Sequence, residues 1–120
     1  MAHYCSIKGW IDTRFEDVPA LEQQIHHYWC EASVAEPSQE RRDMYYQAWH
    51  FPKPSSNWSA YTFLGLDFQQ QYLEWLQTGL MALLNLPFEI TAYFEITNEE
   101  FDDVTTVWQI HHGTFEESQK

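Results

Sequence analysis

Apolar and polar residues alternate most regularly over residues 88–97 of this chain. One set is apolar and comprises Phe88, Ile90, Ala92, Phe94 and Ile96. The other set is mostly polar and comprises Glu89, Thr91, Tyr93, Glu95 and Thr97. Side chains of a strand point to opposite faces in turn, so this pattern predicts a strand with one buried and one wet face. Alternation or strong β-formers predict four more strands, over Tyr4–Ile11, Met44–Phe51, Ser59–Phe68 and Val104–Phe115.

Two other segments carry apolar residues at helical spacing. The first begins at Glu16–Pro19, where a proline suits the opening turn, and is expected to end before Pro37. The second covers Gln69–Leu86 and presents a wide stripe of leucines on one side. Gly79 lies in the middle of this helix, where glycine is about 1 kcal/mol less favourable than alanine.

The remaining segments are expected to connect these elements. Asp12–Arg14 predicts a turn, residues 35–43 a polar loop, Asn98–Asp103 an acidic turn and residues 116–120 a frayed end. The order β-α-β-β-α-β-β predicts a single α+β domain over residues 1–120. We expect an antiparallel sheet of about five strands with two helices on one face, which is the ferredoxin-like arrangement. The other face of the sheet would be open and carry Tyr and Trp side chains.

Charge narrows the choice of partner. The chain holds 18 acidic residues against six Lys and Arg, a formal net charge of −12. Residues 89–120 carry eight of the acids and only one base, Lys120. Such a surface repels phosphate backbones, so we expect no direct binding of nucleic acid. It would speed the encounter with a basic protein.

The acidic excess is densest around residues 95–103, where five carboxylates fall within nine residues. A solvated loop that deters edge pairing is one interpretation of this segment. An electrostatic docking patch is the other, because rings among carboxylates suit the recognition of Lys and Arg. The second interpretation predicts a partner-binding site made of Tyr93, Glu95, Glu99, Glu100, Phe101, Asp102 and Asp103.

No catalytic, metal or cofactor motif stands out. The adjacent pairs His26-His27 and His111-His112 have the wrong local geometry for a metal clamp, and no HExxH or GxSxG occurs. The four glycines are too far apart to cradle a phosphate. We therefore expect no enzyme, no metal and no cofactor. Without a signal-peptide pattern or an apolar run of about 20 residues, we expect a cytoplasmic chain that contacts no membrane.

The segment Ser6-Ile7-Lys8-Gly9-Trp10-Ile11, the net charge and the expected hairpin over residues 88–115 resemble bacterial immunity proteins. These accompany polymorphic or contact-dependent inhibition toxins. The resemblance implies that the chain binds and neutralises a cognate toxin domain, often a basic nuclease.

Two alternative functions stay open. One is a nucleic-acid-mimicking inhibitor of a host nuclease or defence complex. The other is a small-molecule-binding or enzymatic ferredoxin-like domain, with a pocket lined by Trp10, Trp49, Tyr93 or Trp108.

Overall fold

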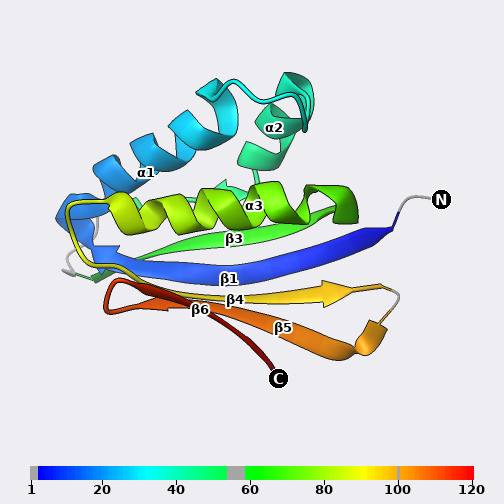
Figure 1. The fold of residues 1–120 in the computed structure, drawn as a ribbon. Coiled ribbons are helices and arrows are strands. Elements are labelled where there is room, and N and C mark those ends of the chain that lie inside the picture. Colours follow the sequence, from blue (N-terminus) through cyan, green and yellow to red (C-terminus); the bar gives the residue numbers. More distant parts are fainter. Residues whose placement is uncertain (1–2, 54–58, 100) are drawn as a thin grey trace.

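The computed structural model describes residues 3–53, 59–99 and 101–120, without the side chains of Ser59 and residues 101–103. In these residues one antiparallel sheet of six strands is combined with three α-helices (Figure 1). The strands are β1 (Tyr4–Arg14), β2 (Trp49–His50), β3 (Ser59–Gln69), β4 (Thr91–Asn98), β5 (Phe101–His111) and β6 (Thr114–Gln119). The α-helices are α1 (Val18–His26), α2 (Gln39–Tyr46) and α3 (Leu73–Met81). A π-helical turn at His27–Glu31 extends α1, and 3-10 turns at Gln70–Tyr72 and Ala82–Asn85 flank α3.

The sheet has the strand order β2-β3-β1-β4-β5-β6, and every neighbouring pair is antiparallel. β1 lies at its centre between β3 and β4. Figure 1 shows the helices on one face of the sheet, while the opposite face has no helix over it. We call this uncovered surface the open face. No helix in the described residues is long and apolar enough to cross a membrane.

The core lies between the helices and the covered face. Phe94 is 1% exposed, and Ile90 and Ile96 are also buried, as the alternation of residues 88–97 predicts. Glu89 is exposed, and Glu95 lies on the opposite face from Phe94. The register of this strand is therefore confirmed, but its predicted start is wrong, because β4 begins at Thr91 and Phe88 lies before it and is only partly buried. The leucine stripe of the second helix is confirmed too, because its members Leu76, Leu80 and Leu83 are buried.

The expected loop over residues 35–43 and strand over Met44–Phe51 are wrong. Ser38 begins α2 by accepting a hydrogen bond from the backbone N–H of Arg41. Arg42 is buried, and its guanidinium donates to the carbonyls of Pro37 and Ala32 at 3.1 and 2.7 Å. These tertiary contacts stabilise a helix in a polar segment, so only the two-residue β2 remains of the predicted strand. The described fold thus has three α-helices rather than two.

The strand count also differs, with six strands in place of about five. Asp12–Arg14 is no turn, because β1 continues through it and pairs with β3. The expected turn Asn98–Asp103 is shorter than predicted, because Asn98 still belongs to β4 and β5 already begins at Phe101. The predicted strand Val104–Phe115 is divided by a tight turn at His112 and Gly113, which have φ angles of 51° and 73°. Residues 116–119 are not frayed, since they pair with β5 as part of β6.

Candidate binding face on the open sheet

The open face is made by alternate residues of the strands. On β1 these are Ser6, Lys8, Trp10 and Asp12, because Cys5, Ile7 and Ile11 are buried on the helix side. The register places Phe63 of β3 and Tyr93 of β4 directly opposite Trp10. Next along the same row come Gln109 and Glu116. Aromatic side chains therefore span the three central strands of this face.

Four of these side chains form a connected group of rings, Trp10, Tyr61, Phe63 and Tyr93, which we call the aromatic cluster. Trp10 stacks on Tyr93 with ring centroids 6.0 Å apart, and meets Tyr61 edge-on at 5.9 Å. Tyr61 and Phe63 are 47% and 51% exposed. Large exposed rings of this kind are enriched at protein-binding surfaces.

Polar side chains surround the aromatic cluster. Asp12 lies opposite Tyr61 on one side and Thr91 on the other. Lys8 lies opposite Gly65 and Glu95. A Cβ atom built on Gly65 would have no other heavy atom within 4 Å, so the surface of β3 is open beside Phe63.

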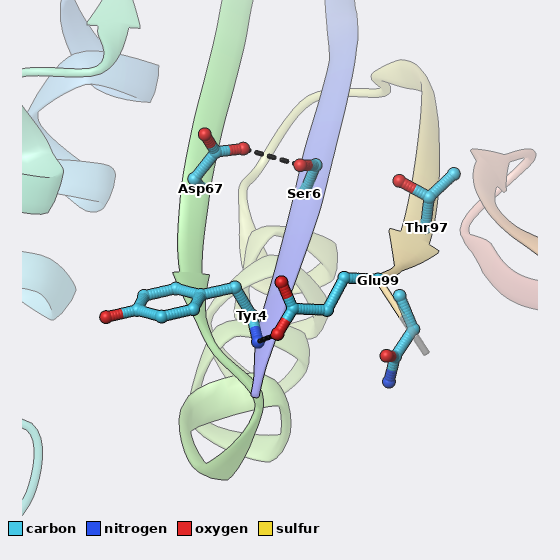
Figure 2. A pocket seen from close by; sticks show the side chains of 6 residues that line it. Tyr4, Ser6, Asp67, Thr97 and Glu99 are labelled. Carbon is cyan, nitrogen blue, oxygen red and sulfur yellow. Dashed lines mark hydrogen bonds between the residues drawn. The ribbon is translucent and has the colours of Figure 1, made fainter. Parts of the chain in front are cut away.

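A polar hollow of about 610 Å³ lies at the end of the open face where β1 begins, away from the aromatic cluster (Figure 2). It is lined by Tyr4, Ser6, Asp67, Thr97, Asn98 and Glu99. The hydroxyl of Ser6 donates to Asp67, and the backbone N–H of Tyr4 donates to Glu99 Oε1 at 3.1 Å. Both carboxylates of the hollow are thus held by the first residues of β1.

The structure separates the residues predicted for the partner-binding site. Tyr93 and Glu95 lie together on the open face, where the Tyr93 hydroxyl donates to Glu95 Oε2 at 3.3 Å. Glu95 also lies 3.4 Å from the ammonium of Lys120, so its charge is partly compensated. Glu99 lies in the hollow at the other end of β4. Glu100 and the side chains of Phe101, Asp102 and Asp103 lie outside the described residues.

The sequence pattern does not indicate Tyr61 and Phe63 as members of the candidate binding face. Both sides of their strand are largely apolar in sequence, so alternation alone does not indicate which side is buried. Thr62 and Leu64 take the helix side and are buried. Trp49 and Trp108, considered for a small-molecule pocket, are buried on that side too and do not reach the open face.

The two cysteines are free thiols, with Cys5 buried and Cys30 partly buried. Burial, reinforced by Asp43, raises the pKa of Cys30 to about 11. Burial also raises the pKa of Cys5. Both thiols therefore stay protonated near neutral pH, which disfavours nucleophilic chemistry. Among the described residues, no three His, Cys, Asp or Glu side chains gather closely enough to hold a metal ion.

Comparison of the chain with family models, with curated proteins and with solved structures found no match. The resemblance to immunity proteins therefore stays a prediction. Function has to be inferred from the chemistry of the open face and from the charge of the chain.

Proposed function

We propose that this chain is an immunity protein that binds and neutralises a basic toxin domain through the open face of its sheet. The observation that carries the proposal is the combination of exposed rings and carboxylates on one uncovered surface. Tyr61 and Phe63 of β3 are about half exposed there, and the carboxylates of Asp12 on β1 and Glu95 on β4 lie on the same face. Rings surrounded by acids suit a partner rich in Lys and Arg.

The overall charge supports the same class of partner. A net charge of −12 on 120 residues repels anionic ligands and attracts a cationic surface over several ångströms. Electrostatic attraction of this kind raises association rates, which matters for an inhibitor that must reach its toxin before damage is done. No catalytic role is needed for such a function.

We also propose that β1, α1, β2, β3, α3 and β4 form a ferredoxin-like unit. Its support is the strand order β2-β3-β1-β4, with antiparallel neighbours and helices on one face. β5 and β6 then extend the sheet beyond β4. This extension widens the open face with Gln109 and Glu116, so the added hairpin enlarges the proposed docking surface.

The test uses the gene next to the one that encodes this chain. Its product, or the C-terminal domain of a large secreted product, is expressed in cells with and without this chain. We expect growth arrest without the chain, restored growth with it, and a stable complex of the two purified proteins whose association slows as salt is added. A neighbouring product that is not toxic, or a toxin that this chain neither binds nor neutralises, would contradict the proposal.

A nucleic-acid-mimicking inhibitor is the alternative that the same experiment separates. A mimic would compete with DNA or RNA for the nucleic-acid site of a host protein. The immunity proposal expects protection against one cognate toxin and none against unrelated nucleases of similar charge.

A further inference from the structure

Asp12 differs from the other carboxylates of the open face. Within the described part of the chain it makes no ion pair or side-chain hydrogen bond, although it is half-buried. Arg14 follows two residues later on the same face of β1, but its guanidinium pairs with Glu16 at 2.6 Å. Asp12 therefore keeps an uncompensated charge.

The other described carboxylates on this face are engaged. Asp67 accepts from Ser6, and Glu99 accepts from the backbone of Tyr4. Glu95 is held by Tyr93 and Lys120. Glu116 lies 3.1 Å from the ring nitrogen of His111. Asp12 is thus the described carboxylate of the open face that is best placed to accept a cation from another molecule.

Two aromatic side chains lie next to the Asp12 carboxylate. Tyr61 lies directly across the strand pair, and Trp10 lies two residues earlier on the same face. The two rings meet edge-on at 5.9 Å, and Tyr61 is about half exposed. A carboxylate next to exposed π faces offers both an ion pair and a cation–π contact.

We infer that Asp12 and the aromatic cluster receive an arginine side chain from the basic partner, an inference that rests on the proposed function. The guanidinium is planar and weakly hydrated, so it stacks on a ring while its N–H groups pair with a carboxylate. A lysine ammonium is a compact, strongly hydrated point charge and cannot fit both groups as well. Arginine at this point would anchor the centre of the interface, where hot spots concentrate.

The experiment titrates the purified chain with three blocked peptides, Gly-Arg-Gly-Arg-Gly and its lysine and citrulline counterparts, at low salt. Nuclear magnetic resonance follows the indole N–H of Trp10, which is assigned from Trp10→Phe. We expect the arginine peptide to shift this signal most and the citrulline peptide to leave it in place. Asp12→Asn should weaken binding of the arginine peptide by roughly fivefold.

Matched variants show whether binding depends on this particular site, or only on the negative charge of the chain and on exposed apolar side chains in general. Asp67→Asn removes the same charge from the far end of the open face and should leave the affinity for the arginine peptide within about twofold. Phe63→Ser should weaken binding, whereas Met44→Ser, at a residue of similar exposure on α2, should not. None of these side chains is buried in the core: Phe63, Asp67 and Met44 are exposed, and Asp12 is half-buried. Circular dichroism should therefore show an intact fold for each variant.

Three results would overturn the inference. They are equal shifts with arginine and citrulline peptides, an Asp12→Asn variant that binds the arginine peptide as the parent does, and oligothymidylate binding on the same rings in preference to the peptides.

The outcomes that contradict the proposed function are different from those that contradict the inferred site. If Asp12→Asn and Phe63→Ser neutralise the toxin as well as the parent does, the inferred site is wrong and the function stands. If the parent binds arginine selectively but protects no cell, the function is wrong and the site stands.

Discussion

A Cβ atom on Gly79 of α3 would lie 2.5 Å from Cε1 of Tyr28, which belongs to the π-helical turn after α1. The Tyr28 ring stacks on Trp75 with centroids 5.8 Å apart, and its hydroxyl donates to the Trp75 carbonyl at 2.8 Å. The two helices can therefore approach this closely because position 79 lacks a side chain.

In Gly79→Ala the methyl group would displace the packed Tyr28 ring, at a cost of about 1–3 kcal/mol. After the gain of about 1 kcal/mol that alanine brings to a helix interior, the free energy of unfolding should fall by up to about 2 kcal/mol. Chemical denaturation checks the result. Gly65→Ala is the matched control and should leave stability unchanged or slightly higher, since nothing lies within 4 Å of its Cβ position. A more stable Gly79→Ala protein would contradict the packing described above.

Arg42→Ala should destabilise the fold by about 2–4 kcal/mol, because hydrogen bonds from a charged donor to buried carbonyls would be lost. Arg42 is 3% exposed and ties α2 to the link between the two helices, through Ala32 after the turn that extends α1 and through Pro37 just before α2. Arg14→Ala removes an equal charge from an exposed ion pair and should cost at most about 1 kcal/mol. Equal effects of the two substitutions in urea denaturation would show that Arg42 is not a structural link.

Leu76→Ala and Leu80→Ala should each cost about 2–5 kcal/mol, because both leave a cavity in the core. Each leucine is 1% exposed. Met81→Ala, on the exposed side of the same helix, should stay within about 0.5 kcal/mol of the parent. Thermal or chemical unfolding of the three variants measures the difference. Near-zero changes at both leucines would contradict their burial.

Stability should fall as the pH rises from about 9 toward about 11, in part through Cys30. The pKa of this thiol is raised in the folded state from 9.0 to about 11. Its contribution is therefore fully present below the unfolded pKa and lost as the pH rises through the folded one. Unfolding experiments across this pH range should show a smaller fall for Cys30→Ala than for the parent. An identical fall in both proteins would mean that the thiol titrates normally.

Charge reversal of Glu99 and Asp103 to lysine should slow association with the toxin and weaken its salt dependence, because rim charges act mainly on encounter. Stopped-flow measurements at several salt concentrations provide the check. Glu99→Gln is the control for local structure, since the side-chain amide can still accept from the Tyr4 N–H. Unchanged association of the double variant at every salt concentration would show that these carboxylates do not take part in docking.

The local sequence pattern was sufficient to predict the buried side of elements whose two faces differ strongly in polarity. The alternation of β4 places Phe94 and Ile96 in the core and Tyr93 and Glu95 on the open face, as the structure does. The spacing of Leu76 and Leu80 likewise indicates the buried side of α3. Two of the predicted site residues, Tyr93 and Glu95, could be placed on one face in the same way.

Tertiary contacts determined the secondary structure and the orientation of segments whose local sequence preference is weak or ambiguous. α2 forms in a polar stretch because the buried Arg42 finds carbonyl partners at Ala32, after the turn that extends α1, and at Pro37, just before α2. No local pattern reveals those partners. On β3, residues on both sides are apolar, so only pairing with β1 turned Tyr61 and Phe63 outward beside Trp10. The aromatic cluster and its position beside Asp12 come from strand register between distant segments, because register brings together side chains that the sequence separates by some fifty residues.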